Sequence, residues 1–196
     1  MFSSISSTVT PILGLARNLE VLIKVDEDFT GFSQGKTNLI IVLDISGSMG
    51  GSQLNNSKTA IKKLVDDTEK TCNFYLITYN SYAKLYDFSK NSVTEIKNIV
   101  DTIRAGSTTC FTNAFAEVTK LVNSIGNKGS TQIVFFTDGK SYPEERDLNG
   151  KLKTMATNIK DKLQNPQIHC LGYGREHDAT LIGNIAASIS GDGTVQ

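Results

Sequence analysis

Short apolar segments with the pattern of buried strands alternate with longer amphipathic segments along most of this chain. Leu39 to Leu43 are branched and apolar without alternation, which is typical of a strand buried on both faces of a parallel sheet. Leu19 to Val25 instead alternates apolar and polar residues, as an edge strand does. The predicted strands are Leu19–Val25, Leu39–Ile45, Phe74–Tyr79, Ala83–Phe88, Ile133–Phe136 and Ile168–Tyr173.

Between these strands, apolar residues recur at the three- and four-residue spacing of an amphipathic helix. Ser92 and Glu95 have the spacing of a capping box, which predicts that a helix begins there. The predicted apolar faces consist of Leu54, Ile61, Leu64 and Val65; Ile96, Ile99, Val100 and Ile103; Phe115, Val118, Val122 and Ile125; Leu152, Met155, Ile159 and Leu163; and Leu181, Ile182, Ile185 and Ile189.

This alternation of strands and helices predicts a doubly wound α/β fold, with a mostly parallel, Rossmann-like sheet and helices on both faces. The tight turn at Asn80 and Ser81 should make its two flanking strands antiparallel, which gives the sheet one antiparallel edge strand. At 196 residues, with 39% hydrophobic and 20% charged residues, the chain is long enough for one well-buried domain and short for two. We therefore expect a flexible Ser/Thr-rich segment over residues 1–17 and a single domain over residues 18–196.

Charge and cysteine content argue against several classes of function. Lysine plus arginine and aspartate plus glutamate both number 20, so the chain lacks the positive field that binds nucleic acids or anionic membranes. No run reaches the roughly 18 apolar residues of a membrane span, and the N-terminus lacks the pattern of a signal peptide. The three cysteines are widely spaced, in or beside apolar segments, which suits a reducing compartment. We expect a cytoplasmic protein without nucleic-acid partners or a membrane span.

Hydroxyl and carboxylate oxygens gather where the buried strands end. Asp44, Ser46 and Ser48 follow the first buried strand at alternate positions, and Asp138 follows the strand Ile133–Phe136. Open α/β sheets bind their ligands at the carboxyl ends of strands, so these loops are expected to converge. The donor atoms are hard oxygens and two are neutral hydroxyls, which favours Mg²⁺ or Mn²⁺ over zinc, with Ca²⁺ as a further option.

The stretch Asp44-Ile45-Ser46-Gly47-Ser48 resembles the D-x-S-x-S signature of the von Willebrand factor A domain. A loop threonine and the segment Thr137-Asp138-Gly139 follow in that family's order. The resemblance implies a metal-ion-dependent adhesion site with one open coordination position. Thr109 is the preferred threonine, because it stands the required five residues before a small residue, Ala114, near the start of a helix. The implied ligands are Asp44, Ser46, Ser48, Thr109 and Asp138.

The function that this resemblance implies is metal-dependent recognition of another protein, not catalysis. If the carboxylates act partly through water, the ion keeps effective positive charge and favours a Glu or Asp from a partner at its open position. One alternative is a Mg²⁺-dependent phosphohydrolase with Asp44 as the nucleophile, although its signature needs a second aspartate where Ser46 stands. Another is a structural scaffold whose metal only steadies the loops. Without a metal, Asp44 could cap the following helix, and the serine hydroxyls could satisfy loop backbone groups.

Several residues near these loops have two interpretations. Tyr79, Tyr82 and Tyr142 adjoin polar loops, where aromatic residues suit a binding rim, but half-buried packing would explain them equally well. His169 lies inside an apolar strand, so we expect it to be a packing residue and not a catalytic base.

The C-terminal part adds two expectations from the resemblance. The segment from Gly172 to Ala186 is similar to the last strand-to-helix turn of intracellular von Willebrand A proteins, which supports a cytoplasmic location. Members of that family normally continue with a strand and a closing helix, whereas only Gly193–Gln196 stand after the last predicted helix. We expect a domain that lacks its final strand and helix.

Overall fold

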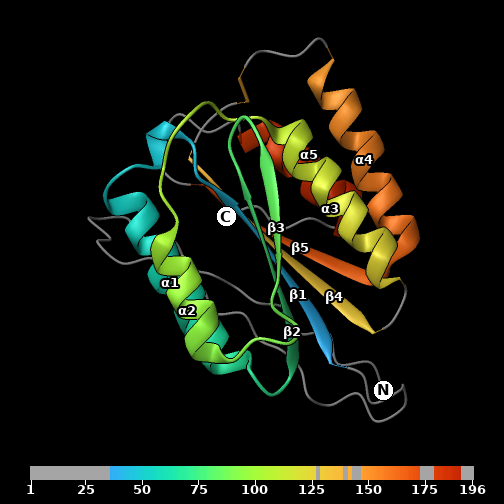
Figure 1. Ribbon diagram of the computed structural model, residues 1–196. Coiled ribbons are helices and arrows are strands. Elements are labelled where there is room, and N and C mark those ends of the chain that lie inside the picture. The colour runs from blue at the N-terminus through green and yellow to red at the C-terminus, as the bar shows by residue number, and fades with distance from the viewer. Residues whose placement is uncertain (1–35, 127–128, 139–140, 143–146, 173–178, 191–196) are drawn as a thin grey trace, which may run out of the picture. The chain divides into compact units, whose positions relative to one another are not determined.

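The computed structural model describes residues 36–126, 129–138, 141–142, 147–172 and 179–190, which form one sheet with helices on both faces (Figure 1). The predicted segment 1–17, the predicted strand Leu19–Val25 and the expected domain boundary at residue 18 lie outside these residues. The elements are β1 (Thr37–Asp44), a short 3₁₀ helix η1 (Gly47–Met49), α1 (Ser52–Thr68), β2 (Cys72–Tyr79), β3 (Ala83–Asp87), α2 (Val93–Thr102), α3 (Phe111–Ile125), β4 (Ser130–Thr137), α4 (Leu148–Lys162), β5 (Gln164–Gly172) and α5 (Ala179–Ser190).

The sheet has five strands in the order β3-β2-β1-β4-β5. β1 pairs in parallel with both β2 and β4, and β5 pairs in parallel with β4. β3 is antiparallel to β2 and forms one edge. The predicted fold class, a mostly parallel α/β sheet with one antiparallel edge strand, is confirmed.

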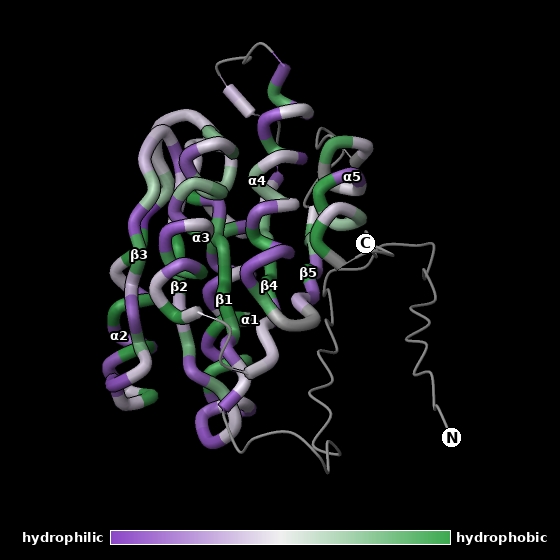
Figure 2. The backbone as a smooth tube through the Cα atoms, turned by 90° about the vertical axis from the view of Figure 1, so that its right-hand side faces the viewer, coloured by the Kyte–Doolittle hydropathy of each residue, from purple (hydrophilic) through white to green (hydrophobic). Residues whose placement is uncertain are grey.

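The central position of β1 explains its unbroken apolar run. Residues 39–43 are at most 2% exposed, because β1 has a neighbouring strand on each side and helices on both faces. Figure 2 shows the same strand as hydrophobic along most of its length. Alternate side chains, including those of Ile40 and Val42, belong to the core between the sheet and α3, α4 and α5. The residues between them point to the face where α1 and α2 lie in Figure 1.

The helices begin largely where the sequence predicts. At the start of α2, the Ser92 hydroxyl accepts a hydrogen bond from the Glu95 amide, and the Glu95 carboxylate accepts one from the Ser92 amide at 2.8 Å. This confirms the predicted capping box. Leu163, predicted on the apolar face of α4, lies one residue beyond that helix and is buried. Among the helices that the structure describes, none is both long and apolar enough to cross a membrane.

Candidate metal centre

The order of the strands brings the loops after β1 and β4 together. These two strands are neighbours and run parallel, so their carboxyl ends lie at the same edge of the sheet. Asp44 is the last residue of β1, and Asp138 directly follows the last residue of β4. Both side chains are buried, at 0% and 7% exposed. Two carboxylates that are 94 residues apart in sequence are therefore placed at one strand edge.

The first loop folds back on Asp44 immediately after the strand. The backbone amide of Ser46 donates to Asp44 Oδ1 at 2.8 Å. The chain then turns through the 3₁₀ helix η1, whose Met49 is fully buried and anchors the turn. Ser46 precedes η1 and Gly51 precedes α1, so Asp44 caps neither helix and that alternative is wrong.

A chain of hydrogen bonds joins three of the predicted ligands. Ser46 Oγ and Ser48 Oγ lie 3.1 Å apart, and Ser48 Oγ donates to Asp138 Oδ1 at 2.9 Å. Gln53, in the first turn of α1, adds a further contact. In the amide orientation that matches donors to acceptors, its nitrogen donates to the Ser48 carbonyl at 2.8 Å and to Asp138 Oδ2 at 2.7 Å. The structure thus brings Ser46, Ser48 and Asp138 into direct contact, and it adds Gln53, which the sequence did not predict.

Thr109 reaches the same edge of the sheet on a separate loop. The Gly106 amide donates to the Ile45 carbonyl at 2.8 Å, and the Gly47 amide donates to the Ser107 carbonyl at 2.9 Å. These reciprocal bonds hold the loop before α3 against the loop after β1. Thr109 itself is 6% exposed. All five predicted ligands therefore lie on loops or strand ends that are in mutual contact.

Ser107 adopts a left-handed backbone conformation in this loop, with φ of 68°. Residues other than glycine seldom adopt this conformation unless their surroundings hold them in it. Here the Ser107 carbonyl accepts from Gly47, and its hydroxyl lies 2.7 Å from that of Ser81. The strained position is thus fixed from both neighbouring loops.

Asp44 lies in a polar pocket within the core. Its Oδ2 accepts from Thr137 Oγ1 at 3.0 Å and from the Tyr79 hydroxyl at 3.3 Å. Burial raises the pKa of the Asp44 carboxyl; hydrogen bonds from Ser46 and Thr137 lower it in part, and the negative charge of Asp138 raises it further. None of the ion pairs in the described part of the chain includes either aspartate. A bound cation would therefore supply the compensating charge that these residues lack.

Three of the candidate ligand oxygens, those of Ser46, Ser48 and Asp138, have separations that are compatible with a small divalent ion. In an octahedral site with ligands at about 2.0–2.1 Å, neighbouring ligand oxygens are about 3 Å apart. The distances of 3.1 Å between the two serine hydroxyls and 2.9 Å between Ser48 and Asp138 are close to this value. Within the described ranges no group of three His, Cys, Asp or Glu side chains could hold an ion, so a site here needs the hydroxyls.

The structure shows where the three tyrosines and His169, which had two interpretations, lie. Tyr79 is wrong as a rim residue: it is fully buried, and burial raises the pKa of its hydroxyl well above the ordinary value. Tyr82 and Tyr142 are 81% and 62% exposed. His169 is half-buried in β5, and burial lowers its pKa. Within the segment Gly172–Ala186, which carried the resemblance to intracellular proteins, residues 173–178 lie outside the described residues.

Comparison with known proteins agrees with the fold. The family profile described as von Willebrand factor type A domain matches residues 38–195. The human inter-alpha-trypsin inhibitor heavy chain H2 is 26% identical over 160 residues, which cover 76% of this chain and 17% of that protein. The chain thus spans about a sixth of the length of this curated relative.

Solved structures share the architecture at lower identity. A von Willebrand factor type A protein from Catenulispora acidiphila has a TM-score of 0.70 at 19% identity, over 82% of this chain and 38% of that one. Proximal thread matrix protein 1 from the mussel byssus, with a zinc-occupied MIDAS motif, has a TM-score of 0.62 at 20% identity, over 82% and 41%. Together with the profile match over most of its length, these similarities show that the chain belongs to the von Willebrand factor type A family.

Proposed function

We propose that this chain recognises another protein through a divalent ion held by Asp44, Ser46, Ser48, Thr109 and Asp138. A Glu or Asp of the partner would complete the coordination of the ion. The observation that carries the proposal is the contact chain from Ser46 through Ser48 to Asp138, beside the buried carboxylate of Asp44, which has no ion-pair partner among the described residues. The family is commonly a metal-dependent protein-interaction module, which supports the same conclusion.

Mg²⁺ is the ion that we propose, with Mn²⁺ or Ca²⁺ as alternatives. All the candidate ligands are hard oxygens, and soft sulfur or imidazole donors are missing from the set. Two carboxylates balance the charge of a divalent ion formally, while the hydroxyls add none. An ion bound in this way would still attract a third carboxylate at an exchangeable position. The zinc in the MIDAS motif of the mussel protein shows that a related site can hold another divalent ion.

The environment of Asp44 supports binding over phosphohydrolase chemistry. A nucleophilic carboxylate must reach the substrate, but Asp44 is 0% exposed and both of its oxygens accept hydrogen bonds from the protein. The position two residues later holds Ser46, not a second acid. We therefore propose that the protein is not an enzyme. Turnover of a generic aryl phosphate in Mg²⁺, abolished by Asp44→Asn, would contradict this.

Backbone hydrogen bonds connect the loops around the candidate site, which argues against the scaffold alternative. Backbone hydrogen bonds join Gly106 to Ile45, Gly47 to Ser107 and Cys110 to Asn80, at 2.8–3.1 Å. These bonds connect the loop after β1, the turn between β2 and β3, and the loop before α3. An ion in their midst would then be available for an external ligand.

We also propose that the protein is located in the cytoplasm. Within the described residues, which include all three cysteines, there is no disulfide. Burial raises the pKa of the Cys170 thiol to about 12 and also raises that of Cys72. Such thiols are packing groups that a reducing compartment would leave unchanged. The balanced net charge argues against nucleic acid as a partner.

Affinity capture with matched variants tests the proposed function. Wild type, Asp44→Ala and Asp67→Ala would be immobilised and exposed to lysate in Mg²⁺ and in EDTA. Asp67 is an exposed helical aspartate far along α1 from the site, so its variant controls for loss of one negative charge. We expect partners that wild type and Asp67→Ala retain only in Mg²⁺ and that Asp44→Ala does not retain. The Asp and Glu residues of the captured partner would then be changed one at a time to Asn and Gln. We expect one of these substitutions to abolish retention.

Retention that depends on neither the metal nor Asp44 would contradict the proposal. Metal-dependent retention that survives every single amide substitution in the partner would refute the carboxylate mechanism alone.

A further inference from the structure

Two exposed tyrosines adjoin the candidate metal centre. Tyr82 and Tyr142 are the only exposed large hydrophobic side chains among the residues that the structure describes. Single exposed apolar residues are common on soluble proteins, so exposure alone has little meaning. Their position is more informative, because one follows the end of β2 and the other follows the end of β4, at the edge of the sheet where the metal loops converge.

Hydrogen bonds show that the tyrosines flank the loop that carries Thr109. The Cys110 amide donates to the Asn80 carbonyl at 3.1 Å, which places this loop against the turn of Tyr82. The Tyr142 amide donates to the Thr109 carbonyl, which places it against the segment after Asp138. The tyrosines therefore lie on segments at either side of the loop that carries the buried Thr109. We call residues 80–82, 107–111 and 141–142 the loop rim.

The loop rim contains no charged side chain. Its residues are Asn80, Ser81, Tyr82, Ser107, Thr108, Thr109, Cys110, Phe111, Ser141 and Tyr142. Exposed tyrosines among serine, threonine and asparagine also characterise antibody binding loops, where the rings supply contact area at little entropic cost. The cores of protein interfaces are likewise depleted in charge and enriched in tyrosine.

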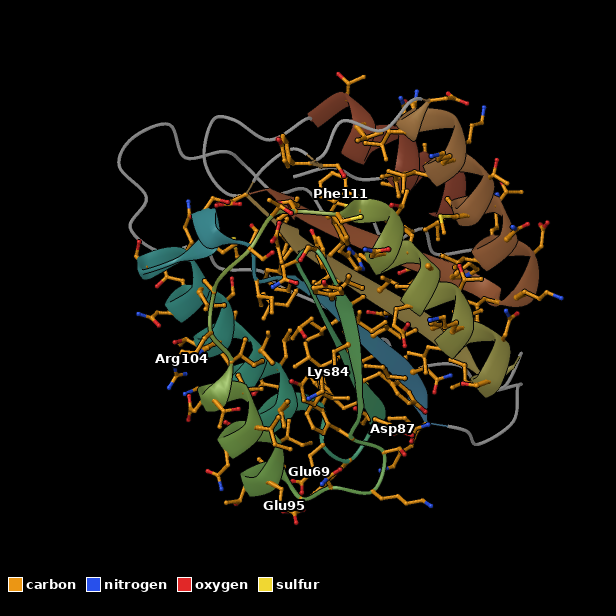
Figure 3. The ribbon with its side chains drawn as sticks, turned by 45° about the horizontal axis from the view of Figure 1, so that its top comes forward. Glu69, Lys84, Asp87, Glu95, Arg104 and Phe111 are labelled. Atoms are coloured by element: carbon orange, nitrogen blue, oxygen red, sulfur yellow. The ribbon has the colours of Figure 1, made fainter. Side chains whose placement is uncertain are left out.

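The described cations that are nearest in sequence to residues 80–82 and 107–111, Lys84 and Arg104, contact other groups. The ammonium of Lys84 lies 4.4 Å above the ring of Tyr86, and the guanidinium of Arg104 donates to the carbonyls of Asp101 and Ile103. Figure 3 shows both basic residues well away from Phe111, which marks the rim at the start of α3. A charged group of a partner that was buried against the rim would therefore lose its hydration without gaining a counter-charge from these residues.

The rim is also held in place before any partner binds. The hydroxyls of Ser81 and Ser107 lie 2.7 Å apart, and Asn113 donates to the Ser81 carbonyl at 2.8 Å. Asn80 donates from its side chain to the Gly106 carbonyl at 2.9 Å. A surface that is already ordered loses little conformational entropy on binding, which favours affinity.

We propose that the loop rim binds the residues on either side of the partner's acidic residue, and that these residues are uncharged and apolar. This rests on the proposed function, and it specifies the partner more closely. The ion would contact the single carboxylate, while the rings of Tyr82 and Tyr142 would pack against aliphatic, aromatic or proline side chains next to it. The partner is then a protein segment with one acidic residue in an otherwise apolar stretch.

Two displayed peptide libraries test this inference on the full chain. Both would be nine residues long and randomised except at the centre, which would be Glu in one and Gln in the other. Selection would be made in Mg²⁺ on wild type, on Tyr82→Ser/Tyr142→Ser, and on Tyr82→Phe/Tyr142→Phe. The serine variant removes the rings at exposed positions, and the phenylalanine variant keeps them.

We expect wild type to enrich Glu peptides over Gln peptides and to select apolar residues beside the Glu. Chosen peptides should bind about tenfold more weakly for each ring removed and about equally well to the phenylalanine variant. Glu-dependent enrichment with charged or random flanks, or with flanks that do not change in the serine variant, would overturn the inference alone. No preference for Glu over Gln would instead overturn the proposed function on which it rests.

Discussion

At the level of single residues, the orientation of Asp44 depends on side chains that would not touch the ion. Ser46 holds one carboxylate oxygen through its amide, while Thr137 and Tyr79 hold the other through their hydroxyls. Because both oxygens of the Asp44 carboxylate accept hydrogen bonds, the carboxylate is held in one orientation toward the ion. Groups that orient a metal ligand in this way commonly contribute a factor of ten or more to affinity.

Thr137→Val should therefore weaken Mg²⁺ binding by about tenfold. It should also lower the free energy of unfolding by about 1–2 kcal/mol, because a buried bond to a carboxylate is lost. Thr131→Val is the matched control, since Thr131 is buried on the same strand and its hydroxyl has no hydrogen-bond partner within the described part of the chain. That change should leave metal affinity unaltered and stability equal or higher. Metal titration and urea unfolding would measure both quantities; equal metal affinity in the two variants would exclude the orienting role of Thr137.

His169 provides a prediction about pH. Burial lowers its pKa from 6.5, so the unfolded chain takes up a proton at a higher pH than the folded chain does. Its contribution to stability is thus lost as the pH falls below about 6.5 toward the lowered value. Urea unfolding between about pH 7.5 and about pH 5 should show wild type losing more stability than His169→Gln. Parallel curves for the two proteins would show that this histidine is not protonated differently in the folded state.

At the level of elements, the sequence predicts the strands and helices well because each has a distinct pattern. The unbroken apolar run of β1 follows from its central position, and the capping box of α2 forms as its spacing predicts. The roles of Tyr79, Thr137 and Gln53 could not be predicted in this way. Tyr79 is the register partner of Asp44 between β1 and β2. Gln53, in α1, contacts Asp138, which lies far from it in the sequence. Such contacts depend on how strands pair and how helices pack against them, which the spacing of apolar residues along the sequence does not specify.

The residue before α1 is a glycine with a backbone conformation that other residues seldom adopt. Gly51 has φ of 84° and ψ of −129°, which is unfavourable for a residue with a Cβ atom. Gly51→Ala should therefore lower the free energy of unfolding by about 1–3 kcal/mol. Gly106→Ala is the control, because Gly106 has open space for a Cβ atom and no positive φ. Its substitution should be neutral or stabilising by up to about 1 kcal/mol, and thermal unfolding of both variants would decide. An equal loss in both would mean that backbone conformation is not the cause.

At the level of the whole molecule, metal binding and folding should be coupled, because the candidate ligands lie on separate loops that unfolding would disperse. An ion that binds only the folded chain at a hundred times its Kd adds about 2.7 kcal/mol to the free energy of unfolding. We expect Mg²⁺ to raise the Tm of wild type and of Asp67→Ala but not of Asp44→Ala, as measured by calorimetry. An increase of the same size in all three proteins would indicate a non-specific salt effect.

Counting bound ions shows whether these loops form one divalent metal site. Titration with Mn²⁺ under electron paramagnetic resonance measures free Mn²⁺, so the bound amount per chain follows by difference. We expect one Mn²⁺ per chain in wild type and in Asp67→Ala, displaced by excess Mg²⁺ and absent from Asp44→Ala. Binding that persists unchanged in a folded Asp44→Ala variant, or no binding by wild type at millimolar Mn²⁺, would contradict this expectation.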